Sequence, residues 1–138
     1  FEKIAAGWEE SLSLLHAAAE ENANLREDAG VAEAAGLHFR STASQVRFIL
    51  ARNALLAGTL KGNERQAQID SIRQAATAEI QTAKRLYALV CRDSRIGFEA
   101  SNHYYYLPLD LVEKVVNCDH VLNTWLPRVA TTTDPTGK

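Results

Sequence analysis

The sequence predicts an all-α protein, a mostly antiparallel four-helix bundle with one long ordered loop between its third and fourth helices. Apolar residues recur every three or four positions in four segments, which is the period of amphipathic helices. Short stretches that disfavour helix separate the first three segments, and short connections place neighbouring helices antiparallel. The connection over 94–107 is longer than the roughly two to eight residues usual between bundle helices, so it is the exception.

Length and composition favour one domain. A chain of 138 residues can bury its own core, and we expect a bundle over 1–126 and a flexible tail over 127–138. The formal charge is −2 and the basic residues are scattered, so we expect no nucleic-acid partner. No apolar run approaches the roughly 20 residues that span a bilayer, so we expect no membrane partner. The chain starts at Phe1 and contains no methionine, so we expect a processed chain or a piece of a longer protein.

The first two helices are predicted from their apolar stripes. The first stripe consists of Phe1, Ile4, Trp8, Leu12, Leu15 and Ala19. A break is expected between about Asn22 and Gly30. The second stripe runs over 31–56 and continues through Gly36, where small neighbours would let another helix come close. Arg40 and Arg47 lie a heptad apart on this helix, and a solvated surface is favoured there over a ligand clamp.

The third helix is expected from Asn63 to about Arg92. Gly58 and Gly62 indicate a tight turn, and Asn63 with Gln66 fits a capping box. Its stripe has a spacing near 3.5, typical of helices that pack at a shallow angle. Glu79 is assigned to the solvated exterior of this helix.

The fourth helix is expected over about Pro108–Leu126. Pro108 suits a first helical turn, and Asp110 with Glu113 gives a second possible capping box. Pro127 is expected to end the helix.

The connection over 94–107 contains the most unusual composition of the chain. Residues 97–106 read GFEASNHYYY and hold three of the four tyrosines. So much apolar area is unlike a solvated linker, and we expect an ordered loop packed on the bundle.

The polar groups of this loop suit sugar binding. Sugars stack their C–H faces on aromatic rings and need both hydrogen-bond donors and acceptors. The candidate substrate-binding residues are Glu99, Asn102, His103 and Tyr104, with Arg40 and Arg47 in second rank. Glu99 and His103 could form an acid/base pair, but no activated nucleophile accompanies them, so no catalytic residue is assigned. No motif has recognised metal-ligand spacing, so no metal or other cofactor is expected.

A structural interpretation of the same residues stays open. The tyrosines would then cap the hydrophobic core, and Glu99, Asn102 and His103 would satisfy backbone groups of the loop. The state of the two thiols, Cys91 and Cys118, is also open, because no sequence rule decides it.

A family resemblance favours the sugar-binding interpretation. The runs RDSRIGFEASNHYYY (92–106) and LVEKVVNC (111–118), and the earlier LHFRS (37–41) and QVRFILAR (45–52), resemble the C-terminal helical region of large bacterial carbohydrate-active, glycoside-hydrolase-like proteins. The resemblance covers about residues 1–126. It implies an upstream catalytic domain, typically a barrel, that holds the acid and base and receives loop residues from the helical domain.

The expected function is therefore that of an accessory C-terminal helical domain of a bacterial glycan-degrading enzyme. Its expected partners are the upstream catalytic domain of the same polypeptide and a saccharide, and the resemblance implies a secreted or periplasmic protein. This chain has no room for a barrel, so catalysis on its own is not expected. The alternative is a helical docking or oligomerisation module, for example a homo-oligomer, without sugar binding.

Overall fold

The described residues of this protein are helical and contain no strand. The computed structural model describes residues 1–97 and 107–131. Its elements are α1 (Glu2–Glu21), α2 (Leu25–Leu56), α3 (Gly62–Arg92), α4 (Pro108–His120), a π-helical turn (Val121–Trp125) and α5 (Leu126–Thr131). The predicted all-α class is confirmed. The predicted loop detail falls on 98–106, and the tail on 127–138; residues 98–106 and 132–138 lie outside the described residues.

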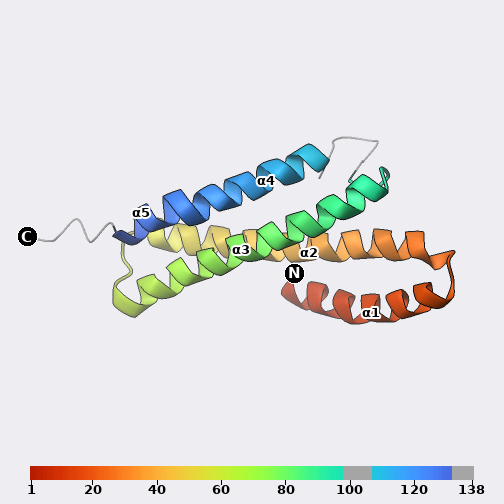
Figure 1. Ribbon diagram of the computed structural model, residues 1–138. Coiled ribbons are helices and arrows are strands. Elements are labelled where there is room, and N and C mark those ends of the chain that lie inside the picture. The colour runs from red at the N-terminus through yellow and green to blue at the C-terminus, as the bar shows by residue number, and fades with distance from the viewer. Residues whose placement is uncertain (98–106, 132–138) are drawn as a thin grey trace, which may run out of the picture.

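The bundle prediction is confirmed in part. Helices α2 and α3 lie side by side, α4 and α5 pack on α3, and α1 packs on α2 (Figure 1). Because α1 and α4 contact different helices, the described residues form three closely packed arms, α2, α3 and α4–α5, with α1 as an outlying fourth helix.

The turn between α2 and α3 is formed as expected, but the capping prediction there is wrong. Gly58 and Gly62 adopt φ values of 70° and 50°, in the left-handed region that favours glycine. The N-cap of α3 is Lys61, without a side-chain cap hydrogen bond. Asn63 thus lies inside the first helical turn, where its side chain is not placed to cap.

The last helical arm differs from the prediction at both ends. At its start the Leu107 N–H donates to Asp110 Oδ2 over 3.1 Å, so Asp110 acts from the third helical position and does not pair with Glu113 as a cap. At its end the helix continues through Pro127 to Thr131, so Pro127 does not end it.

The π-helical turn explains how Pro127 is tolerated. Proline has no N–H and its ring clashes with the carbonyl one turn before it in an α-helix. In the preceding turn the Leu126 N–H donates to the Val121 carbonyl, one residue further back than in an α-helix. This widened turn directly precedes Pro127 and moves the hydrogen-bond register at the place where the ring would clash.

Two apolar clusters form the core. One joins Ala34 and Leu37 of α2 to α3 and Leu111 of α4. The other joins Ala51 of α2 to Ile69 and Ile72 of α3 and Leu126 of α5. Burial of such side chains supplies most of the stability of a helical domain.

A buried polar layer lies between these clusters along α2 and α3. It is formed by the buried Ser41 and Glu79 and the partly buried Lys114, with Ser44 and Thr82 also buried. Glu79 Oε1 accepts from Ser41 Oγ at 2.5 Å and from Lys114 Nζ at 2.7 Å. Glu79 is 6% exposed, so its assignment to the solvated exterior is wrong. A charge in the core is tolerated here because α4 supplies its counter-ion.

Helix α1 is held on α2 in another way. Only Ala5 and Ala19 of α1 are buried, although the sequence stripe includes Phe1 and Ile4, which are exposed. The Trp8 ring lies over Gly36, and its Nε1 donates to the Ala32 carbonyl over 2.7 Å. The expected close helix approach at Gly36 is thus confirmed, with a tryptophan as the approaching group.

Two ion pairs and one contact between a histidine and a carboxylate set the register of α1 on α2. They join Glu2 to Arg47, Glu9 to Arg40, and His16 to Glu33. Each pair advances by one heptad on both helices while the helices run in opposite directions, as in an antiparallel coiled coil.

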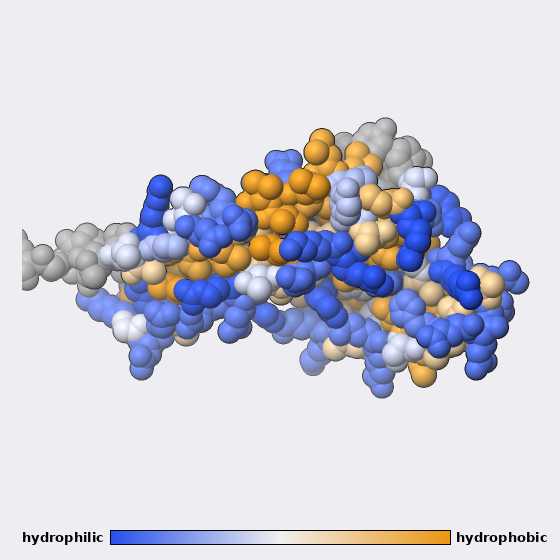
Figure 2. Space-filling view, viewed as in Figure 1, coloured by the Kyte–Doolittle hydropathy of each residue, from blue (hydrophilic) through white to orange (hydrophobic). Residues whose placement is uncertain are grey.

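No helix within the described ranges is long and apolar enough to cross a membrane. Figure 2 shows hydrophobic atoms gathered over α4. Leu109, Val112 and Val116 form this outer stripe of α4, and their exposed fractions are 74%, 46% and 60%.

Candidate functional site

The site residues predicted from the sequence fall into two groups. Glu99, Asn102, His103 and Tyr104 lie outside the described residues, so their role stays a prediction. Arg40 and Arg47 lie on α2, on the side where α1 packs. Arg40 Nε donates to Glu9 Oε1 over 2.8 Å, and Arg47 pairs with Glu2.

The two arginines therefore have interhelical partners. Both side chains are about half exposed, which agrees with the surface interpretation favoured above for this face. Neither lines the pocket described next.

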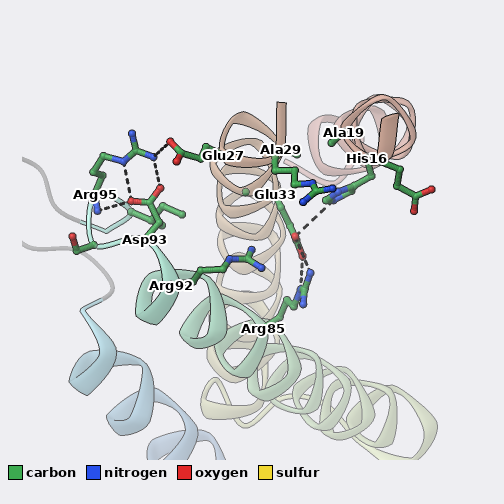
Figure 3. Close-up of a pocket in the computed structure, with 14 residues that line it drawn as sticks. His16, Ala19, Glu27, Ala29, Glu33, Arg85, Arg92, Asp93 and Arg95 are labelled. Carbon is green, nitrogen blue, oxygen red and sulfur yellow. Dashed lines mark hydrogen bonds and ion pairs between the residues drawn. The ribbon is translucent and has the colours of Figure 1, made fainter. Parts of the chain in front are cut away.

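A pocket of about 1090 Å³ lies where residues 93–97 lead toward the predicted sugar-binding loop. Three helices build it: the C-terminal half of α1, the first turns of α2 and the last turns of α3 (Figure 3). Four arginines line it, which are Arg26, Arg85, Arg92 and Arg95. Four carboxylates also line it, which are Glu20, Glu27, Glu33 and Asp93.

One group of charges in the pocket is centred on Glu33. Its side chain is 10% exposed and lies between His16 and Arg85, as Figure 3 shows. Arg85 binds both carboxylate oxygens, with its second terminal nitrogen 2.8 Å from Oε2. His16 Nε2 is 3.7 Å from Oε2. The hydrogen bonds that Arg85 donates to Glu33 raise the pKa of Arg85, so this bidentate pair stays charged.

The second group is centred on Arg95. Its guanidinium donates to both oxygens of Asp93, at 2.9 and 2.6 Å, and to Glu27 Oε2 at 3.0 Å. Asp93 also accepts from the Arg95 N–H at 3.0 Å, which closes the turn after α3. These hydrogen bonds lower the pKa of Asp93 to about 2, so the carboxylate is ionised at neutral pH.

Arg92 and Arg26 are different. Within residues 1–97 and 107–131 neither side chain has a hydrogen bond or an ion pair. Arg92 points toward α2 (Figure 3), and its guanidinium would lie 3.8 Å from a β-carbon at Gly30, which is an ordinary contact distance. Three of the four carboxylates are already paired, so among the described residues Arg26, Arg92 and Glu20 are the charged groups of the pocket without a hydrogen bond or an ion pair.

This arrangement suits an anionic ligand. Guanidinium groups bind carboxylate in a planar, bidentate geometry. Among the described residues no three His, Cys, Asp or Glu side chains converge to hold a metal ion. The sequence offers one weak signal for the pocket, the seven-residue spacing between Arg85 and Arg92 on the third helix.

Both cysteines are free thiols in the structure. Cys91 is exposed near the end of α3, and Cys118 is half-buried on α4. Burial, and next the negative charge of Glu79, raise the pKa of the Cys118 thiol. The Cys118 thiol is therefore a poor nucleophile at neutral pH.

Comparisons of the chain with models of protein families, with curated proteins and with solved structures find no match.

Proposed function

We propose that this chain is a helical accessory domain of a bacterial glycan-degrading enzyme, one that packs on an upstream catalytic domain of the same polypeptide and helps to bind a saccharide. The observation that carries the proposal is the pocket with Arg92 and Arg26, because it holds uncommitted cationic groups next to the segment that leads to residues 98–106. An accessory domain that contacts substrate needs polar groups at its surface to bind the substrate. It does not need a catalytic acid and base of its own.

The charges of the pocket favour an acidic sugar. Arg92 and Arg26 would bind the carboxylate of a uronic acid, while Glu20 and His16 offer an acceptor and a ring nitrogen for sugar hydroxyls. Arg85 and Arg95 keep their carboxylate partners and hold the walls in place. The candidate residues Glu99, Asn102, His103 and Tyr104 would complete the site with stacking and hydrogen bonds.

The outer stripe of α4 supports the packing half of the proposal. Leu109, Val112 and Val116 are large, exposed and aligned on one helix face. Contiguous exposed apolar side chains mark interaction surfaces in soluble domains.

An NMR titration with two matched sugars tests the saccharide half. Glucuronate and glucose at millimolar concentrations differ in the carboxylate. We expect glucuronate, and not glucose, to shift the amide signals of residues 26–33 and 92–97. Arg92→Gln should weaken glucuronate binding by about tenfold or more, since a hydrogen bond to a charged group contributes about 1.5–3 kcal/mol.

Two controls make the result specific. Arg73→Gln removes an exposed arginine of α3 that pairs with Asp70 and does not line the pocket, so it should leave binding unchanged. Acetate tests the sugar ring. If acetate shifts the same signals as strongly as glucuronate, or if no pocket signal moves with either sugar, the saccharide proposal is wrong.

The second candidate function is self-association through the same apolar stripe of α4, without sugar binding. Light scattering separates the two. A monomer at all concentrations that responds to glucuronate supports the accessory domain. Concentration-dependent dimers that Val116→Ser abolishes, with no response to glucuronate, support the oligomerisation module.

A further inference from the structure

Helices α2, α3 and α4 leave one corner of a four-helix bundle open. In such a bundle each helix packs on two neighbours and lies diagonally across from the third. Both α2 and α4 pack on α3, and no Cα atom of α2 lies within 8 Å of a Cα atom of α4. Among the described helices α1 contacts only α2, so it does not occupy the corner between α2 and α4 (Figure 1).

A pocket of about 480 Å³ lies at this open corner. Its floor includes Ala75 and Ala76 of α3, which are both buried. Phe48 and Ile49 of α2, together with Val121, supply apolar walls. Because the side chains of the floor are small, another helix can approach α3 to the roughly 8–10 Å that is usual between packed helices.

The apolar surface continues along α2 beyond the pocket. Thr42, Ile49 and Leu56 are spaced by heptads and share one face of α2. Ile49 is 44% exposed and Leu56 is 68% exposed. The stretch from Thr42 to Leu56 is about 21 Å long at 1.5 Å per residue, which is more than a small molecule covers. A helix can cover it, because a helix satisfies its own backbone hydrogen bonds in an apolar groove.

The charges of the pocket favour a basic segment. Three carboxylates line it, from Glu79, Asp110 and Glu113, against the one ammonium group of Lys114, which leaves an excess of two negative charges. Lys114 Nζ pairs with Glu79 over 2.7 Å. Within the described residues Glu113 is exposed and has neither a hydrogen bond nor an ion pair. The α4 side of the corner therefore offers a carboxylate to a Lys or Arg side chain.

The direction of a helix in this corner follows from the core. Leu111 of α4 shares a core cluster with Leu37 of α2. Leu126 of α5 shares the other cluster with Ala51 of α2, so α2 and the α4–α5 arm run the same way. A helix that completes the up-and-down pattern runs opposite to both. Its C-terminal half then lies beside Glu113, where basic residues also suit the helix dipole.

We propose that the open corner between α2 and α4 binds an amphipathic helix of a partner protein, with the apolar face of that helix on α2 and α3 and with Lys or Arg residues in its C-terminal half beside Glu113. The corner shares no lining residue with the arginine-lined pocket. The outer stripe of α4 does not line it. The inference does not depend on the saccharide.

Two synthetic peptides of about 18 residues test it. Both have one leucine face on an alanine helix, and the charged residues of the C-terminal half are Lys in one and Glu in the other. We expect the Lys peptide to shift the amide signals of Ala75, Ala76 and Val121. Fluorescence anisotropy at low salt should give it an affinity at least about threefold above that of the Glu peptide. A scrambled peptide with the composition of the Lys peptide should not bind.

Surface variants locate the binding. Ile49→Asp should lower the affinity for both peptides about tenfold or more, because it places a charge in the apolar groove. Glu113→Lys should remove the preference for the Lys peptide. Glu64→Lys makes the same change of net charge at an exposed position of α3 outside the pocket, so the preference should persist. Val112→Ser, on the outer stripe of α4, should change neither affinity.

The overturning results are equally definite. If both peptides bind the wild-type protein equally, or if Glu113→Lys and Glu64→Lys alter the preference alike, the acidic side of the corner does not select the partner and the proposal is wrong. If neither peptide moves the pocket signals, or if Ile49→Asp binds as tightly as the wild type, the corner is not the site. Circular dichroism of each variant confirms that it is folded before its affinity is compared.

Discussion

Helix α1 and helix α3 pack on the same partner, α2, by different means. In α3 large apolar residues are fully buried, for example Ile72 at 0% and Leu89 at 1% exposed. In α1 the buried residues are two alanines, and the contacts that align it are one tryptophan, two exposed ion pairs and the contact of His16 with the buried Glu33. The burial of apolar side chains thus holds α3 on α2. The contacts of α1 fix its register on α2 more than they contribute to the free energy of folding.

The difference has a consequence for motion and for the candidate site. Regions with few buried apolar contacts open at a lower free energy than the core. Helix α1 supplies His16, Ala19 and Glu20 to the arginine-lined pocket. Opening of α1 would therefore remove one wall of that pocket while α2, α3 and α4 stay folded.

The largest expected effect is a substitution in the α3 core. Ile72→Ala should lower the free energy of unfolding by about 2–5 kcal/mol, because it leaves a cavity in a fully buried cluster. Leu14→Ala on α1, where the side chain is 73% exposed, should change it by less than about 0.5 kcal/mol. Urea denaturation followed by circular dichroism measures both. A comparable cost at Leu14 would mean that α1 has a buried face of its own.

A smaller effect is expected where α1 meets α2. A β-carbon at Gly36 would lie 2.7 Å from Trp8 Cδ1, while one at Gly7 would meet nothing within 4 Å. Gly36→Ala should therefore cost about 1–3 kcal/mol through overpacking. Gly7→Ala should instead gain up to about 1 kcal/mol from helix propensity.

Hydrogen exchange shows where the Gly36 effect acts. Protection should fall in α1 and in the first half of α2, with α3 little changed. If Gly36→Ala were as stabilising as Gly7→Ala, the Trp8 ring would have to move without cost, and the packing described for α1 would be wrong.

The surface ion pairs come next. Arg40→Gln removes the pair with Glu9, whose side chains are 48% and 44% exposed, and should cost at most about 1 kcal/mol. The cost should vanish in about 1 M NaCl, where the screening length is about 3 Å. Thermal melts at low and high salt measure it. A cost that persists at high salt would indicate a packing role for the Arg40 stem.

The helices themselves could be predicted from the sequence because periodicity is a local signal. The stripe of 69–90 identified α3, and Gly58 with Gly62 identified the turn, since φ there requires glycine. The first and last residues of the helices were less predictable. Local rules predict that Asn63 caps the third helix and that Pro127 ends the last one. Neither holds, because packing decides where a helix starts and whether one of its turns can widen.

The candidate pocket and the polar layer could not be predicted in the same way. In the sequence, Glu79 lies among polar residues that we assigned to the solvated exterior of the third helix. Only the position of Lys114 on another helix makes the burial of Glu79 tolerable. Likewise Arg92 and Arg26 line one pocket only because α2 and α3 run side by side. Partners that lie far apart in sequence leave no periodic trace, so such sites need the tertiary structure.

The smallest expected effect is a dependence of stability on pH. It concerns His38 of α2, the helix on which both α1 and α3 pack. Partial burial of the ring, and next the positive charge of Lys114, lower its pKa, while Glu79 acts in the opposite direction. A histidine whose pKa is lower in the folded state binds protons more readily when unfolded, so its contribution favours folding above about pH 6.5 and is lost as the pH falls through the folded pKa.

His38→Gln should therefore make the melting temperature fall less than in the wild type between about pH 7.5 and about pH 5.5. His120→Gln, at an exposed position on α4, is the matched control for the general effect of losing a histidine. Equal slopes in the wild type and in His38→Gln would show that neither burial nor the charge of Lys114 lowers the pKa of His38 in the folded protein.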